Sequence, residues 1–215
     1  MPEYLQPYEE AVATHGPGFR ATLWRESGYQ RTRFRVMAEL LGAMGLANPS
    51  LVDAGCGLAD FAAYLHEQRV PFQRYLGVEG VAEMADAARQ RGLADVRIRV
   101  ADFAVEPQAL LPSPVDEQVL LFSGSLNSFR QEPALAVLDR VWAAGPRALI
   151  FNFLSDANRL PPAAPGDPAH RFDTRALLNW AFDCTPRVAF RQDYFEGGHD
   201  ATIAMLPRVP AVRAD

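Results

Sequence analysis

The sequence predicts one α/β domain built around a mainly parallel β-sheet. From residue 50 onward, short apolar runs rich in β-branched residues alternate with helical patterns of ten or more residues. This alternation is typical of successive strand–helix–strand units. The chain has 215 residues, enough for one sizeable core and too few for two ordinary domains. We therefore expect residues 1–215 to form a single domain.

Five apolar runs are the expected parallel strands. They are mostly apolar along their whole length, as in strands that helices cover on both faces. The runs are residues 51–54, 75–79, 96–101, 118–123 and 148–153. Helices are expected between them, beginning near Leu58, Val81, Pro107 and Phe129.

Local signals mark the ends of several helices. Ser128 and Gln131 have the S-x-x-Q spacing of a capping box before the fourth helix, and Gly92 is expected to end the second. Ser27 and Gln30 have the same spacing at the start of an amphipathic helix predicted over residues 27–44. Residues 1–49 are therefore expected to form a helical cap on an α/β core of residues 50–206.

The C-terminal part of the chain changes character. Two strand-like runs, residues 188–195 and 200–206, are joined by Gly197-Gly198-His199, a local hairpin signal. An antiparallel hairpin is expected to close the sheet. Residues 155–172 are rich in Pro and Ala, and a segment of this length without regular structure is expected to be a rim or lid.

Composition excludes several classes of function. The formal net charge of -5 leaves no basic field for nucleic acid, and the chain has no lysine, which removes Walker-type and Schiff-base chemistry. No apolar stretch approaches the roughly 20 residues that a membrane helix needs, so a cytoplasmic protein is expected. Cys56 and Cys184 lack metal-ligand spacing, as do the four histidines, so no metal is expected.

A glycine turn follows the first predicted strand in the run SLVDAGCGLAD. Gly55 and Gly57 would let the backbone approach a ligand closely, and Cys56 would offer its backbone N–H rather than its thiol. A dinucleotide fingerprint needs a small residue where this run has Asp60, so a nicotinamide oxidoreductase is disfavoured. With Asp53, the turn reads D-x-G-x-G.

This motif resembles motif I of the class I S-adenosylmethionine-dependent methyltransferases. The resemblance extends through YLGVEG, Ala101-Asp102-Phe103 and QVLLFSGSLNSF to the final hairpin, and so covers nearly the whole chain. It implies a Rossmann-like fold with seven strands in the order 3-2-1-4-5-7-6, with S-adenosylmethionine as cofactor and S-adenosylhomocysteine as product. The runs HGPGFRATLWRESGYQRTRF, FNFLS and RQDYFEGGHDATI look like a group of bacterial methyltransferase-like proteins of unassigned substrate.

The resemblance implies a series of cofactor contacts at successive strand ends. The glycine turn would bind the methionine half, Glu79 the ribose hydroxyls, and Asp102 the adenine amino group with Phe103 against the base. The structural alternatives are a turn cap for Asp53, a surface charge for Glu79 and a helix N-cap for Asp102. Arg33 either pairs with the cofactor carboxylate or is structural. The expected cofactor residues are Arg33, Asp53, Gly55, Cys56, Gly57, Glu79, Gly80, Met84, Asp102, Phe103, Ser123 and Gly124.

The methyl acceptor is expected to be a small molecule held near the ends of the fourth and fifth strands. The run SGSLN lacks the (N/D)-P-P-(Y/F) sequence of enzymes that methylate adenine or glutamine nitrogens, which disfavours those families. Side chains named for the acceptor site, each with a purely structural alternative, are Trp24, Asn127, Asn152, Tyr194 and His199. A base, where one is needed, would come from His15, Asp193, Tyr194 or His199, and no catalytic residue is assigned. The alternative function is a non-catalytic sensor or partner subunit that binds S-adenosylmethionine, and the oligomeric state stays open.

Overall fold

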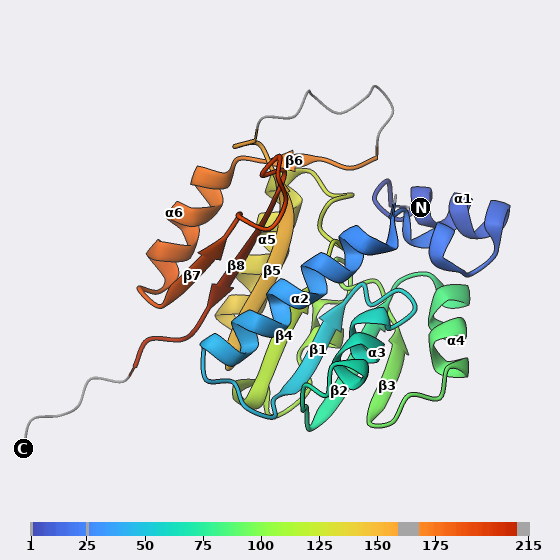
Figure 1. The fold of residues 1–215 in the computed structure, drawn as a ribbon, viewed down its shortest axis with the longest axis horizontal. Coiled ribbons are helices and arrows are strands. Elements are labelled where there is room, and N and C mark those ends of the chain that lie inside the picture. The colour runs from blue at the N-terminus through green and yellow to red at the C-terminus, as the bar shows by residue number, and fades with distance from the viewer. Residues whose placement is uncertain (1, 25, 159–167, 210–215) are drawn as a thin grey trace, which may run out of the picture.

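The computed structural model of the protein describes residues 2–24, 26–158 and 168–209. Its centre is one eight-stranded sheet in the order β3-β2-β1-β4-β5-β8-β7, with β6 paired to β5 outside this path (Figure 1). The first five strands are parallel, whereas β8 runs antiparallel to both β5 and β7. The strands are β1 (Ser50–Ala54), β2 (Arg74–Glu79), β3 (Val96–Val100), β4 (Gln118–Phe122), β5 (Ala148–Ser155), β6 (Arg171–Phe172), β7 (Val188–Arg191) and β8 (Asp200–Met205). Without the two-residue β6, this is the predicted order, which is confirmed.

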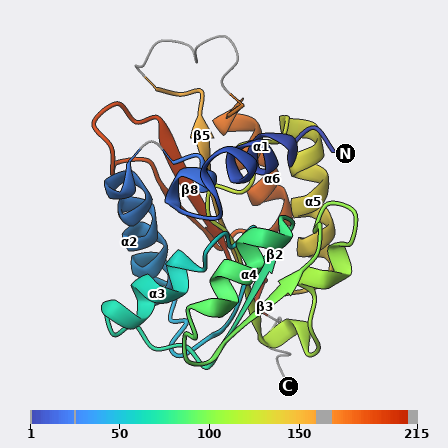
Figure 2. The same cartoon turned by 90° about the vertical axis from the view of Figure 1, so that its right-hand side faces the viewer.

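Helices cover both faces of the sheet, with α2 and α3 on one side and α5 and α6 on the other (Figure 2). The α-helices are α1 (Gln6–His15), α2 (Ser27–Ala43), α3 (Asp60–Glu67), α4 (Ala82–Gln90), α5 (Gln131–Ala143) and α6 (Thr174–Cys184). The 3-10 helices are η1 (Phe19–Thr22), η2 (Pro107–Leu110) and η3 (Val115–Glu117). Within the described ranges, no helix is long and apolar enough to cross a membrane.

The sheet separates two hydrophobic cores. Successive side chains of a strand point to opposite faces, and β4 shows the consequence clearly. Val119 and Leu121 pack with α2 and α3, whereas Leu120 and Phe122 pack with α5 and α6. All four are buried, so β4 is the apolar centre of the fold. The edge strand β3 is different, because its arginines leave it partly exposed.

The predicted N-terminal cap consists of two parts. Helix α2 is a regular part of one helical layer, since Phe34, Met37 and Leu40 are buried in the core beneath it. The segment before it, with α1 and η1, lies instead at the carboxyl ends of the strands. There Leu5 packs so closely on Gly80 that a Cβ at position 80 would lie 3.0 Å from its side chain.

The prediction of a helix that begins near Pro107 is wrong. This connection contains only the short 3-10 helices η2 and η3. Pro112 and Pro114 explain the failure, because each lacks the N–H that would continue a helix and its ring clashes with the preceding turn.

Both predicted capping boxes are also wrong. Helix α5 has Arg130 as its N-cap, and the Gln131 side chain accepts a hydrogen bond from the backbone N–H of Asp173. Helix α2 has Glu26 as its N-cap, and Gln30 donates to Asp60 on α3. In both cases, the glutamine has a tertiary partner instead of its own helix terminus.

The C-terminal third contains elements that the sequence pattern did not reveal. Within the segment expected to be irregular, β6 is a short strand, and residues 159–167 lie outside the described part of the chain. Helix α6 follows it. The hairpin is less tight than predicted, because β7 ends at Arg191 and residues 192–199 form the connection to β8.

Helix α6 depends on a side-chain cap that can be tested. Asp173 Oδ1 accepts a hydrogen bond of 2.9 Å from Ala176 N–H, a group that would otherwise lack a partner in the first turn. We expect Asp173→Ala to lower the free energy of unfolding by about 1 kcal/mol in urea denaturation. Asp173→Asn, which keeps the acceptor, is the control and should stay close to wild type; equal losses in the two variants would contradict the capping role.

Candidate functional site

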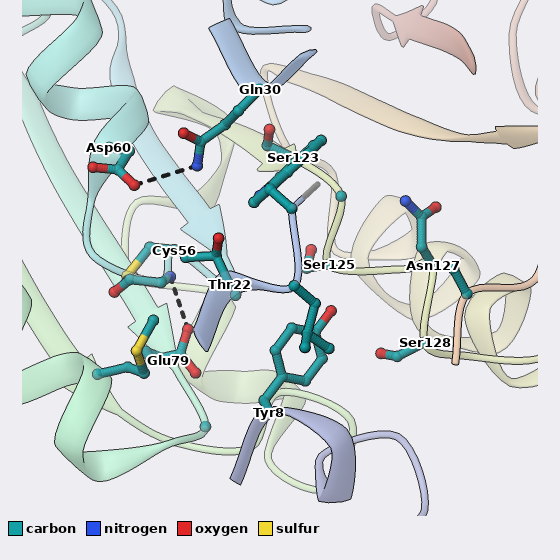
Figure 3. A pocket seen from close by; sticks show the side chains of 18 of the residues that line it. Tyr8, Thr22, Gln30, Cys56, Asp60, Glu79, Ser123, Ser125, Asn127 and Ser128 are labelled. Carbon is teal, nitrogen blue, oxygen red and sulfur yellow. Dashed lines mark hydrogen bonds between the residues drawn. The ribbon is translucent and has the colours of Figure 1, made fainter. Parts of the chain in front are cut away.

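A cavity of about 980 Å³ lies at the carboxyl ends of the parallel strands (Figure 3). This is the edge where α/β sheets bind ligands, at the point where strand order reverses, here between β1 and β4. Residues after β1, β2 and β3 line one half of the cavity, which we name the glycine-turn half. Residues from the ends of β4, β5 and β8, together with β6, line the other, which we name the β5 half. Ligand pockets span roughly 300–1,000 Å³, so this volume lies at the upper end of the usual range.

The glycine turn folds back tightly between the two halves. Gly55 has a φ of +70°, and a Cβ there would lie 2.5 Å from Ser125 Cβ in the loop after β4. Only glycine fits both that backbone and that contact. Gly55 N–H and Cys56 N–H both donate to the carbonyl of Val78, which ties the turn to β2. The burial of Cys56 raises the pKa of its thiol, as expected for a residue with a structural role.

Glu79 is a buried carboxylate and not a surface charge. Its side chain is 8% exposed, and its two oxygens accept hydrogen bonds from Gly57 N–H at 2.8 Å and from Val81 N–H at 2.9 Å. Burial raises the pKa of Glu79, whereas the backbone hydrogen bonds oppose that rise. A carboxylate has about four acceptor sites. Two donors therefore leave capacity for hydroxyl groups of a ligand.

Asp53 lies deeper in the wall of the same half. It is 2% exposed, and the Tyr75 hydroxyl donates to its Oδ2. Burial, opposed by this hydrogen bond and reinforced by the charge of Glu79, raises the pKa of Asp53 to about 7. Asp53 Oδ1 has no partner among the described residues, and the hydroxyls of Ser123 and Ser125, which follow the neighbouring strand β4, are likewise buried without partners there. Because the protein supplies no hydrogen-bond partner for these atoms, they are suited to bind a polar group of a ligand.

Asp102 and Phe103 follow β3 at the far end of the glycine-turn half. Asp102 caps its own turn through Ala104 N–H at 3.0 Å, and it also accepts from the Tyr4 hydroxyl at 2.7 Å. The Tyr4 ring stacks on Phe129 with 4.2 Å between centroids, and Phe103 stacks on the same ring at 5.8 Å. Asp102 therefore has a structural role as a turn cap. Asp102 and Phe103 also both line the cavity.

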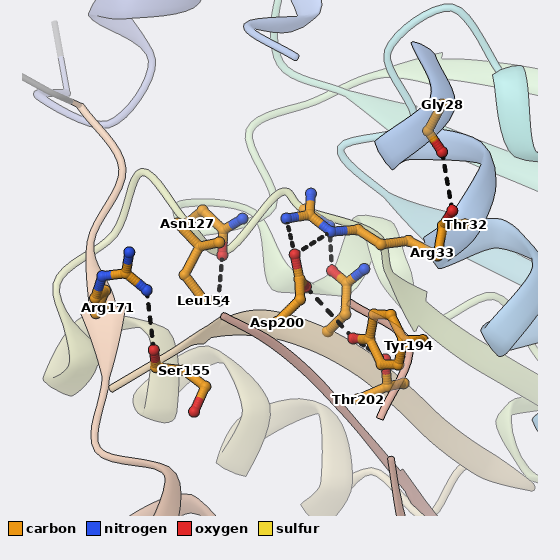
Figure 4. Close-up of polar contacts among 12 residues, drawn as sticks. Gly28, Thr32, Arg33, Asn127, Leu154, Ser155, Arg171, Tyr194, Asp200 and Thr202 are labelled. Carbon is orange, nitrogen blue, oxygen red and sulfur yellow. Dashed lines mark hydrogen bonds and ion pairs between the residues drawn. The ribbon is translucent and has the colours of Figure 1, made fainter. Parts of the chain in front are cut away.

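A buried ion pair fixes the boundary between the two halves (Figure 4). Arg33 on α2 donates its Nε to Asp200 Oδ2 at 2.7 Å and its Nη2 to the same oxygen. The guanidinium also lies 4.0 Å from the Trp24 ring centroid. A Cβ at Gly124 would lie 2.8 Å from this ring, so the close contact and a φ of +78° both require glycine there. The predicted role of Arg33 toward a cofactor carboxylate stays a prediction that now concerns its remaining nitrogen, Nη1.

The structure brings most of the predicted site residues together. All twelve cofactor candidates line the cavity, as do Trp24, Asn127 and His199 from the acceptor candidates. Asn152 does not, because it is fully buried and accepts a hydrogen bond of 2.6 Å from Gly124 N–H. Tyr194 also lies elsewhere, since its hydroxyl contacts Thr202 at 2.9 Å and its ring lines a separate depression.

Several residues that line the cavity were not predicted from the sequence. Ser125 belongs to the run SGSLN and could have been found from its place after β4. Tyr8, Tyr29 and Arg171 carry no such signal, because α1, α2 and β6 bring them to the cavity only in the folded chain. Burial and the charge of Glu79 raise the pKa of the Tyr8 hydroxyl, and its hydrogen bond with Ser128 opposes the rise.

Comparisons with known proteins define the class of fold. No protein-family model and no curated protein sequence matches the chain. Magnesium protoporphyrin IX methyltransferase ChlM of Synechocystis, solved with S-adenosylhomocysteine, is 16% identical with a TM-score of 0.63 over 95% of this chain and 94% of that one. Haemonchus contortus phosphoethanolamine N-methyltransferase 1 is 13% identical, with a TM-score of 0.66 over 99% of this chain and 50% of that one. The small RNA methyltransferase HEN1 is 14% identical, with a TM-score of 0.62 over 83% of this chain and 25% of that one.

The chain therefore has the fold of the class I S-adenosylmethionine-dependent methyltransferases.

The Arg33–Asp200 ion pair leads to a prediction about stability. Removing one partner of a buried pair leaves an uncompensated charge, so Arg33→Met and Asp200→Leu should each lower the free energy of unfolding by roughly 3–5 kcal/mol in urea denaturation. The double variant should lose less than the sum, because no unpaired charge remains. The exposed pair Arg89–Asp86 is the control, where Asp86→Ala should cost under about 1 kcal/mol. Strictly additive losses at positions 33 and 200 would contradict the coupling.

The raised pKa of Asp53 leads to a prediction about pH. The folded state holds this proton up to about pH 7, whereas the unfolded chain releases it near its ordinary value of about 3.9. The stabilising contribution of the proton is therefore complete below about pH 4 and is lost as the pH rises to about 7. The free energy of unfolding of the wild type should fall over this range relative to Asp53→Asn, by on the order of a few kcal/mol. Urea denaturation at several pH values tests this, and parallel curves for the two proteins would show the assignment to be wrong.

Proposed function

We propose that the protein is an S-adenosylmethionine-dependent methyltransferase that acts on a small molecule. The observation that carries this proposal is the tie between the glycine turn and the buried carboxylate of Glu79 at the edge of a class I methyltransferase sheet. Such a pair offers a backbone without side chains beside an acceptor for ribose hydroxyls. The second half of the cavity then remains for an acceptor.

The cofactor would occupy the glycine-turn half. Gly55 and Gly57 would allow its methionine part to approach the backbone, with the unpartnered oxygen of Asp53 as acceptor for its ammonium group. Glu79 would accept from the ribose, and Phe103 would pack against the adenine. Gly80 and Met84 also line this half, and Ser123 and Gly124, directly after β4, line the cavity next to it. Solved structures of similar fold that contain S-adenosylhomocysteine support S-adenosylmethionine as the cofactor.

The protein would contribute mainly position and a dry environment to the reaction. Bound S-adenosylmethionine supplies an electrophilic methyl group, and holding the acceptor lone pair in line with it provides much of the rate. Of the four bases named from the sequence, His199 alone lines the cavity. Its ring stacks on Phe195 with 4.7 Å between centroids. We assign to it the removal of a proton from acceptors that carry one.

A small acceptor is favoured over a macromolecule. The volume of the cavity lies within the range of small-ligand pockets, and the net charge of -5 provides no general attraction for nucleic acid. The neighbours of similar fold include enzymes named for small molecules and one named for RNA. The negative net charge of this chain favours an acceptor of the former kind.

The role of Glu79 can be tested by calorimetry. We expect Glu79→Gln to weaken binding of S-adenosylhomocysteine by about tenfold or more, because the amide cannot accept from both backbone N–H groups and the ribose hydroxyls together. The control is Glu83→Gln, the same change at an exposed position in the first turn of α4 that does not line the cavity. Equal affinities in the two variants, with both proteins folded by circular dichroism, would refute the assignment.

Turnover is tested separately from binding. The wild type should form S-adenosylhomocysteine from S-adenosylmethionine in the presence of a suitable small acceptor, detected by mass spectrometry. Tight binding without product across a broad panel of O, N, S and C acceptors would favour a sensor or partner subunit instead.

A further inference from the structure

The β5 half of the cavity contains an arginine, Arg171. Arg171 lies in β6, where it pairs with Leu154 of β5 and lines the cavity. Its Nη1 donates to the backbone carbonyl of Ser155 at 3.1 Å. Among the described residues, no carboxylate forms an ion pair with it. The other cavity arginine, Arg33, is neutralised by Asp200 and differs in this respect.

Charge is distributed unevenly between the two halves. The carboxylates that line the cavity are Asp53, Asp60, Glu79 and Asp102, and all four belong to the glycine-turn half. Among the described lining residues, the β5 half has no carboxylate. Among the described residues, no carboxylate therefore compensates the positive charge of Arg171, and an anion that entered this half would compensate it.

A second donor is fixed by the same strand end. Asn127 accepts a hydrogen bond of 3.2 Å from Leu154 N–H through its Oδ1, which leaves its Nδ2 as a donor (Figure 4). The amide orientation follows from this contact, since a backbone N–H requires an oxygen opposite it. Adjacent residues of β5, Leu154 and Ser155, thus orient Asn127 and Arg171. The two side chains form a donor set anchored to a buried strand.

We propose that the methyl acceptor is a small anionic molecule whose carboxylate or phosphate group is bound by Arg171, with Asn127 as a second donor. Arginine suits this task because its planar fork matches both groups and its charge does not depend on pH. Trp24, which packs on Gly124 after β4, and Tyr29, whose ring centroid lies 6.2 Å from that of His199, also line the cavity and would provide apolar surface for the rest of the molecule. The inference rests on the proposed function for the position of the cofactor, and it adds the chemical class of the acceptor.

The test uses matched probes on the full chain saturated with S-adenosylhomocysteine. Benzoate and phenyl phosphate carry the two anionic groups on a ring, and benzamide is the neutral counterpart. We expect at least one of the anions to bind at least tenfold more tightly than benzamide in calorimetric or ligand-observed NMR titrations. The stronger anion identifies whether the site prefers a carboxylate or a phosphate. Equal affinity for all three probes, or no binding of either anion, would overturn the inference.

Variants at position 171 assign the preference to this side chain. Arg171→Met should remove the preference for the anion, while Arg171→Lys should retain part of it, because it keeps the charge and loses the fork. The control is Arg175→Met, the same loss of charge at an exposed position on α6 that does not line the cavity. A preference that persists in a folded Arg171→Met, or one that Arg175→Met removes equally, would refute the role of Arg171.

The outcome separates this inference from the proposed function. If the wild type does not bind S-adenosylhomocysteine, the proposed function fails, and the three probes are then titrated into the ligand-free protein. A tenfold preference for an anion that depends on Arg171 would still support an anion site in the β5 half. If the cofactor product binds and the anions do not, the methyltransferase proposal stands and the anionic acceptor is refuted.

Discussion

The hydrogen bond from Gly57 N–H to the Glu79 carboxylate is the contact on which the cavity depends. It holds the loop after β1 against the end of β2. The second oxygen of Glu79 accepts a hydrogen bond from the N–H of Val81, the N-cap residue of α4. The left-handed conformation of Gly55 turns the chain back toward β4, where Ser125 leaves no room for a Cβ. A carboxylate this deeply buried is tolerated because both of its oxygens accept from the backbone. Three strand ends are thereby fixed around one concave surface.

A second constraint joins the ends of the chain. Arg33 and Asp200 are 167 residues apart in sequence, and their ion pair fixes α2 to the first residue of β8. Because Trp24 packs on the Arg33 guanidinium and on Gly124, the segment before α2 is held against the end of β4 as well. The antiparallel hairpin is therefore more than a cover for the sheet edge. It supplies the charge that neutralises Arg33 and so sets the boundary between the two halves of the cavity.

The sequence predicted the parts that depend on periodicity and on local turn chemistry. The parallel strands and the glycine turn followed from alternating apolar runs and from D-x-G-x-G, whereas the strand order followed from the resemblance to the class I methyltransferases. The errors arose where a side chain had a choice of partners. Gln30 and Gln131 have capping-box spacing, yet each binds a different element. Asn152 was expected to face the acceptor, but strand register turns it beneath Gly124 instead. Arg171 reaches the cavity only because β6 pairs with β5, a pairing of two residues that no local pattern marks.

The cavity wall contains buried polar atoms that have no hydrogen-bond partner among the described residues. Native proteins pair more than about nine in ten of their buried polar groups. Asp53 Oδ1 and the hydroxyls of Ser123 and Ser125 are exceptions that line this cavity, and Asn152 Nδ2 is an exception outside it. Each such group costs roughly 1–3 kcal/mol while it lacks a partner. A ligand that supplies the missing partners recovers that free energy, and by linkage its binding also stabilises the fold.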